Sequence, residues 1–110
     1  MTETASIDAT TLPAAALEAA AEFYRDIVPQ VREADRGNRA ILFARAEYTH
    51  AAWRLAAIQS LARELAPDRV NGVVIDITET GWAGARELLD YLALAPGITG
   101  QIFETGAIGD

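Results

Sequence analysis

The segment from Ala51 to Asp76 constrains the fold most, because a helix pattern is followed by a strand pattern after only a short turn. Pro67 ends the helix, since proline has no backbone N–H and disfavours the helical conformation in the residue before it. The run through Val73, Val74 and Ile75 is typical of a strand covered on both faces of a parallel sheet. The periodicity predicts one buried helical stripe, formed by Trp53, Leu55, Ala56, Ile58, Leu61, Ala62 and Leu65.

The remaining patterns extend this unit to an α/β domain. We expect a short parallel sheet of three strands, at about 39–45, 69–77 and 101–104, with helices at about 13–34, 49–66 and 82–94. Pro29 lies late in the first helix and is expected to kink it. Residues 1–12 show no periodicity, so we predict a flexible lead-in followed by a single domain from 13 to 110.

Two patches resemble a known family. The run LARELAPDRVNGVVI, residues 61–75, resembles the helix, turn and sixth strand of the short-chain dehydrogenase/reductases. The run ITGQ, residues 98–101, resembles the approach to that family's last strand. Because the two patches occur in the family's order, the chain is similar to the C-terminal half of its Rossmann-like fold, in a degenerate and truncated form. This similarity extends over about residues 14–106.

The resemblance implies a dinucleotide site, which requires a glycine-rich turn after a first strand. None of the eight glycines forms such a motif, and the lone Gly81–Gly84 pair is more typical of a structural turn. Thr80 is a weak remnant of the family's cofactor-contacting threonine. We therefore expect the chain to bind no cofactor.

The resemblance also implies a Ser, Tyr, Lys catalytic set, in which the lysine lowers the pKa of the tyrosine so that it can exchange a proton with substrate. Counting back from Pro67 leaves two registers open for this set. The implied positions are Glu47 or Tyr48 for the tyrosine, Ala51 or Ala52 for the lysine, and Ala44 or Arg45 for the serine. The lysine is absent in both registers, so we expect a pseudoenzyme without catalytic activity.

A different site is the alternative. Glu47, Tyr48 and His50 follow a predicted parallel strand, at the end of the sheet where α/β proteins bind ligands, and Glu47 could orient His50. They would make the protein a small-molecule binder or a divergent enzyme. The simpler interpretation is a solvated helix start, in which Glu47 offsets the helix dipole. With one histidine and no cysteine, we expect no multi-histidine or thiolate metal site.

Composition limits the partners. Sixteen acidic and nine basic residues give a net charge of -7, which argues against nucleic acid, an anionic membrane or a phosphate-rich ligand. Neither a signal peptide nor an apolar run long enough for a membrane span is visible, and we expect a cytoplasmic protein.

The resemblance implies assembly as well. In the family, the fourth and fifth helices pair with their copies, and the corresponding helices here are 14–33 and 51–66. We therefore expect a non-catalytic subunit or scaffold that forms a homodimer, or a heteromer with a full-length reductase. The expected interface residues are Leu17, Tyr24, Trp53 and Leu61. Strand 39–45 is expected at a sheet edge, with Arg39 and Arg45 guarding it against edge-to-edge pairing.

Overall fold

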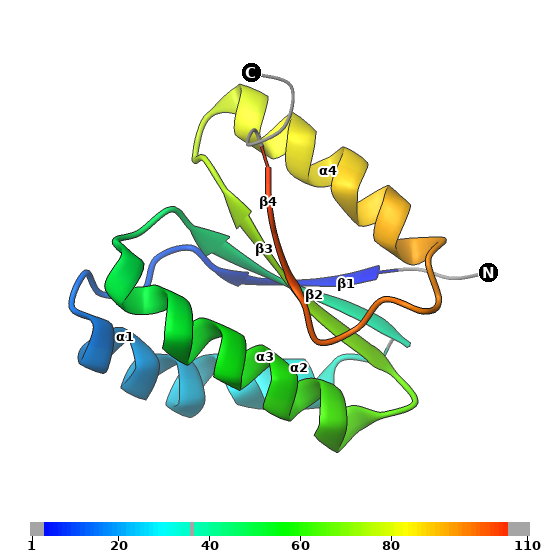
Figure 1. Cartoon of the computed structure of the whole chain (residues 1–110), viewed down its shortest axis with the longest axis horizontal. Coiled ribbons are helices and arrows are strands. Elements are labelled where there is room, and N and C mark those ends of the chain that lie inside the picture. The colour runs from blue at the N-terminus through cyan, green and yellow to red at the C-terminus, as the bar shows by residue number, and fades with distance from the viewer. Residues whose placement is uncertain (1–3, 36, 106–110) are drawn as a thin grey trace.

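The computed structural model describes residues 4–35 and 37–105, which form an α/β fold with a parallel sheet of four strands. The strands lie side by side in chain order, β1-β2-β3-β4 (Figure 1). The α/β class and the adjacent, parallel order of the three predicted strands are confirmed. The elements are β1 (Thr4–Ala9), α1 (Ala16–Glu22), a π-helical turn (Phe23–Ile27), α2 (Val28–Glu33), β2 (Asn38–Ala44), a 3-10 turn (Tyr48–His50), α3 (Ala51–Leu65), β3 (Arg69–Ile75), α4 (Glu79–Ala93) and β4 (Ile102–Glu104).

Residues 4–9 form a strand, so the expectation of a flexible lead-in is wrong over this segment. β1 pairs in parallel with β2 along its whole length, and it holds the place beside β2 that the resemblance gives to the family's fourth strand. The sheet has four strands, not three. Ile7 and Ala9 are buried while Ser6 and Asp8 are exposed, the alternation of a strand with one face covered. Such a short and half-polar strand gives little signal in the sequence.

β2 is consequently an inner strand, and the expectation that it forms an edge is wrong. Arg39 does not guard an edge either, because its side chain is buried. It donates to the Asp68 carboxylate at 2.9 Å and to the Ala34 carbonyl at 2.7 Å. The arginine thus ties the start of β2 to the segments that lead into β2 and β3.

The helices cover the sheet unequally. α1, α2 and α3 lie along one face, whereas α4 lies alone on the other (Figure 1). The larger core fills the space under the three helices and includes Phe23, Val31, Ile41, Phe43, Ile58 and Val70. The smaller core lies under α4 and consists of Ala40, Leu42, Val73, Ile75, Ala85 and Leu92. Side chains of β2 and β3 enter both cores, as the apolar runs in these strands predict.

The first helical segment contains the interruption expected near Pro29. The segment begins at Ala16, and the π-helical turn Phe23–Ile27 precedes the proline. A proline inside a regular α-helix loses one backbone hydrogen bond and collides with the carbonyl four residues earlier. The wider π-helical turn relieves that collision, since it changes the spacing of the carbonyls before the proline.

α4 begins at Glu79, a few residues before the predicted start at 82. Thr78 caps this helix, because its hydroxyl oxygen accepts a hydrogen bond from the Gly81 N–H at 3.0 Å. A side chain at Gly81 would place its first carbon 1.8 Å from the Asp76 carbonyl oxygen. Only glycine fits there, so Gly81 serves a tight structural turn.

Candidate functional site

The loop after β2 carries Glu47, Tyr48 and His50 at the carboxyl end of the sheet. His50 is buried, and both of its ring nitrogens are occupied: Nε2 lies 2.8 Å from the Ala14 carbonyl, and Nδ1 accepts from the Trp53 indole N–H at 3.2 Å. Glu47 therefore does not orient His50, contrary to the hypothesis from the sequence. Glu47 and Tyr48 are exposed, Tyr48 to 88%.

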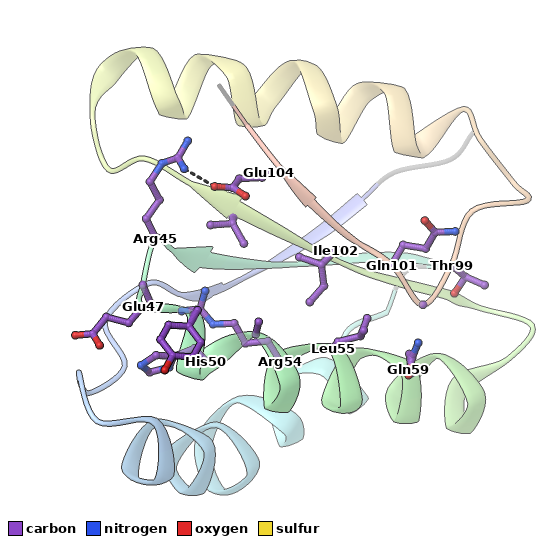
Figure 2. A pocket seen from close by; sticks show the side chains of 15 residues that line it. Arg45, Glu47, His50, Arg54, Leu55, Gln59, Thr99, Gln101, Ile102 and Glu104 are labelled. Carbon is purple, nitrogen blue, oxygen red and sulfur yellow. Dashed lines mark hydrogen bonds and ion pairs between the residues drawn. The ribbon is translucent and has the colours of Figure 1, made fainter. Parts of the chain in front are cut away.

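This loop forms one wall of an open cleft of about 860 Å3, which we name the α3–β4 cleft. The second wall is the side of α3 at Arg54, Leu55 and Gln59, and the third is the segment from Thr99 to Ile102 that leads into β4. Figure 2 shows the charged side chains toward one end of the cleft, Leu55 and Ile102 in the middle, and Gln59 and Gln101 toward the other end. The cleft is thus polar at both ends with an apolar middle.

One end of the α3–β4 cleft is fixed by Arg45. Its guanidinium forms an ion pair with Glu104 (Figure 2). It also donates to the Thr105 carbonyl at 2.8 Å. The loop after β2 is therefore tied to the end of β4 across the top of β3. Arg45 thus crosslinks two strand ends, instead of guarding an edge of β2.

Arg54 is the most unusual side chain of the cleft. It is 8% exposed, and its guanidinium carbon lies 4.6 Å from the centre of the Phe43 ring. Its Nε is buried without an acceptor, and burial lowers the pKa of the guanidinium below its ordinary value. Arg54 is absent from the buried stripe that the sequence predicts for this helix. The signal that was missed is its spacing, four residues before Ile58 and seven before Leu61, both buried.

A smaller hollow of about 290 Å3 lies where β1 and β2 end. Its lining includes Ala9, Ala14, Ala44, Glu47 and Arg54. This hollow is the place that the resemblance gives to the family's catalytic serine, and alanine occupies one of the two implied positions there. Ala51 and Ala52, the positions implied for the lysine, are exposed in the first turn of α3.

The four expected interface residues do not share one surface. Leu17 and Tyr24 are exposed, to 88% and 51%. Leu61 is 4% exposed and belongs to the larger core, so its assignment to an interface is wrong. Trp53 is partly buried, and its ring lies 5.3 Å from Phe23 and 6.0 Å from Phe43, centre to centre. The apolar stripe of α3 packs against the sheet. It is therefore not available as the apolar surface of an interface.

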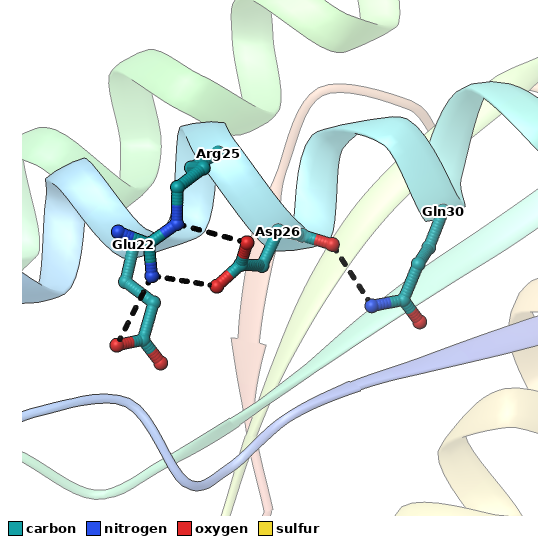
Figure 3. A network of polar contacts seen from close by, with 4 residues as sticks. All are labelled: Glu22, Arg25, Asp26 and Gln30. Carbon is teal, nitrogen blue, oxygen red and sulfur yellow. Dashed lines mark hydrogen bonds and ion pairs between the residues drawn. The ribbon is translucent and has the colours of Figure 1, made fainter.

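A network of polar contacts joins Glu22, Arg25, Asp26 and Gln30 along the first helical segment (Figure 3). Arg25 donates two hydrogen bonds to the Asp26 carboxylate, at 2.9 and 2.8 Å, which holds the pKa of Asp26 below its usual range. The Gln30 amide donates to the Asp26 carbonyl at 2.9 Å and so satisfies a carbonyl of the π-helical turn. The exposed Tyr24 directly precedes this charged cluster in the chain.

Within residues 4–35 and 37–105, no three histidine, cysteine, aspartate or glutamate side chains are grouped closely enough to hold a metal ion. In the same part of the chain, no helix combines the length and the apolar character needed to cross a membrane. Thr80, the weak cofactor remnant, falls in the first turn of α4, and its side chain lies outside the described residues.

Comparison with known proteins gives one match. A family model described as SDR-like, short chain dehydrogenase-like protein, covers residues 7–105. The matched span takes in the second half of β1 and every later element through β4. It confirms the family seen in the sequence and extends it toward the N-terminus, to the strand that the sequence analysis missed. No curated protein and no solved structure matches the chain significantly.

Proposed function

Since this chain belongs to the short chain dehydrogenase-like family, we propose that it is a non-catalytic subunit or scaffold, which pairs in the cytoplasm with a second copy or with a full-length reductase. One observation carries the proposal: all nine basic residues are arginine, so the 110-residue chain has no lysine. The family's proton transfer, as the resemblance implies it, depends on a lysine beside the catalytic tyrosine. This chain cannot supply that group from any position.

The surroundings of the implied catalytic positions support the same proposal. Ala44 lines the small hollow at the ends of β1 and β2, and His50, the only histidine, already uses both ring nitrogens in contacts with Ala14 and Trp53. A general base needs a free nitrogen or oxygen within reach of substrate. Neither residue meets that requirement, so neither Ala44 nor His50 replaces the proton-transfer group of a reductase in this hollow.

The outer surface of α1 and the π-helical turn is the contact face we propose. Leu17 and Tyr24 project from it, and large exposed apolar side chains of this kind often mark a protein contact. The charged cluster of Arg25 and Asp26 lies next to Tyr24 and would form a polar rim. An apolar centre with a polar rim is the usual anatomy of a protein interface.

Sedimentation velocity at micromolar concentration tests this contact. Leu17→Glu should shift the wild-type dimer toward the mass of a single chain, because a charge would be buried at the contact. Leu94→Glu is the matched control: Leu94 is exposed to 83%, close to the 88% of Leu17, but it ends the helix on the opposite face of the sheet. A wild-type chain that stays monomeric and forms no complex with a purified full-length reductase would contradict the proposed contact.

A nicotinamide dinucleotide tests the absence of a cofactor separately. Titration calorimetry with NADH and with NADPH should give no saturable heat at micromolar protein. Stoichiometric, tight uptake of either dinucleotide would overturn the assignment as a non-catalytic subunit.

A small-molecule binder or divergent enzyme that uses the loop of Glu47, Tyr48 and His50 is the second candidate. The observation that favours it is the position of this loop on the α3–β4 cleft. Tyr48→Phe separates the two candidates, because the exposed hydroxyl can be removed without loss of packing. An unchanged ligand profile after this substitution would remove Tyr48 from the site.

A further inference from the structure

Arg54 carries a positive charge that no group of the described chain compensates. Within residues 4–35 and 37–105 it forms no ion pair, and its Nε has no acceptor although the side chain is only 8% exposed. The guanidinium carbon lies over two aromatic rings, 4.6 Å from the centre of Phe43 and 6.0 Å from the centre of Trp53. The Nε of the other buried arginine, Arg39, also lacks an acceptor, but its two terminal nitrogens donate to a carboxylate and a carbonyl. Of these two arginines, Arg54 is therefore the one whose guanidinium has no anionic or carbonyl partner among the described residues.

This arrangement favours an acceptor from outside the chain. An arginine remains protonated in proteins, even where burial lowers its pKa. The Phe43 ring attracts the face of the guanidinium, but it cannot accept the five N–H donors that lie in the guanidinium plane. A largely buried cation with an unpaired buried donor, here Nε, is unfavourable until an anion pairs with it.

The α3–β4 cleft gives such an anion room and access. Arg54 lines the cleft, and the cleft volume of about 860 Å3 lies within the range of about 300–1,000 Å3 that is typical of small-molecule sites. Next to Arg54 the cleft is lined by Leu55 and Ile102, and further along by Gln59 and Gln101 (Figure 2). A ligand with its charge on Arg54 would therefore place its next carbons against apolar side chains.

The charges around the cleft restrict the ligand to one negative charge. Arg45 is already paired with Glu104 and with the Thr105 carbonyl, so it is not available. Glu47 adds negative charge to the same lining, whereas the Glu104 carboxylate is neutralised by Arg45, and the whole chain carries a net charge of -7. In this lining a dianion such as phosphate would meet the cation of Arg54 and the unpaired carboxylate of Glu47, which disfavours it.

We propose that the α3–β4 cleft binds a linear monocarboxylate, with the carboxylate on the guanidinium of Arg54 and the carbon chain against Leu55 and Ile102. A planar carboxylate matches the fork of guanidinium donors, and the pairing is stronger than a neutral hydrogen bond. The site is independent of the proposed contact face, which lies on α1, and it does not require a catalytic role.

Titration of the full chain with sodium hexanoate tests the proposal, with amide chemical shifts in two-dimensional NMR as the readout. Hexanoate should give saturable shifts in α3 around residues 54–59 and in the segment 99–102. Hexanamide keeps the carbon chain but lacks the charge, and inorganic phosphate lacks the carbon chain. Both should bind at least about tenfold more weakly, the loss expected when a charge-assisted contact or its apolar support is missing.

Two variants locate the charge. Arg54→Met should abolish saturation by hexanoate, while Arg63→Met, the same change at an exposed position of α3, should leave it unchanged. Equal binding of hexanoate and hexanamide to the wild type would overturn the proposal without any variant. Equal binding of phosphate and hexanoate, or an unchanged hexanoate affinity in a folded Arg54→Met protein, would overturn it as well.

Discussion

Replacement of Arg54 by methionine should stabilise the protein in the absence of ligand, which is the reverse of the usual effect of a buried substitution. Methionine keeps an unbranched apolar stem of similar shape and removes the charge. Arg54 as a residue is 8% exposed, and its guanidinium lies 4.6 Å from the Phe43 ring centre and 6.0 Å from the Trp53 ring centre, with no acidic partner among the described residues. The substitution therefore removes a desolvated cation without leaving a second buried charge behind.

The size of the effect follows from two opposing contributions. Replacing buried ionic groups by apolar residues of similar volume stabilises proteins by up to about 4 kcal/mol. Loss of the contact with Phe43 costs about 0.5–2 kcal/mol. Water in the open cleft reduces the penalty on the wild-type cation, so we take the lower part of the range and expect a net stabilisation of about 1 kcal/mol. For a domain of about this size, that corresponds to a rise in Tm of about 4–8 °C.

Urea and thermal denaturation followed by far-UV circular dichroism measure this change. The midpoint should rise with an unchanged m-value, since the surface exposed on unfolding is nearly the same. Arg63→Met should change the free energy of unfolding by no more than about 0.5 kcal/mol, as at other exposed positions. A lower Tm for Arg54→Met would refute the reasoning, because it would mean that the guanidinium already has a compensating partner.

Three further predictions concern the core and one ion pair. Gly72→Ala should lower stability by about 1–3 kcal/mol, because the new methyl group would lie 3.2 Å from atoms of Phe43 and Ile102, whereas Gly97→Ala, with open space around it, should not. Phe23→Ala should lower the free energy of unfolding by about 3–5 kcal/mol, since it leaves a cavity around a fully buried aromatic side chain. Urea midpoints measure the losses of Gly72→Ala and Phe23→Ala, with Gly97→Ala as the reference that should be tolerated. Glu64→Gln should remove part of the pH dependence: the hydrogen bond from the Arg32 guanidinium lowers the pKa of Glu64, so that stabilisation is present above the carboxyl's ordinary value of 4.5 and is lost as the pH falls through the lower folded value. The Tm difference between wild type and Glu64→Gln should shrink in that acidic window, and a difference that stays constant from pH 7 to pH 3 would contradict this assignment.

The unit of β2, α3 and β3 could be predicted because its signals are local and long. α3 has regular spacing over fifteen residues, and β3 is an apolar run bounded by Pro67 and the turn after Ile75. β1 could not be predicted in the same way. β1 forms a strand because it pairs with β2, more than thirty residues later in the chain. Its own sequence gives little signal, since Ile7 is the one large apolar side chain among its six residues.

The functional residues show a different limit of the sequence. The periodic pattern of a helix shows how buried positions are spaced. It does not show how the helix is rotated about its axis, and so which residue at the border of the stripe is buried. Leu55 was assigned to the stripe and is 41% exposed at the cleft, while Arg54, the residue beside it, is buried. The rotation of α3 against the sheet determines which of Arg54 and Leu55 is buried. That rotation depends on packing against Phe23 and Phe43, which are distant from each other in the sequence.

The wholly parallel sheet has a consequence for how the chain folds. Each strand pairs only with strands about thirty or more residues away, as Gly72 does with Ile102, so no two strands can associate through a tight hairpin. The segment between two paired strands has to fold across the sheet before those strands can form their hydrogen bonds. We expect the refolding rate to lie in the slow range for a domain of this size, even though helices form readily on their own timescale.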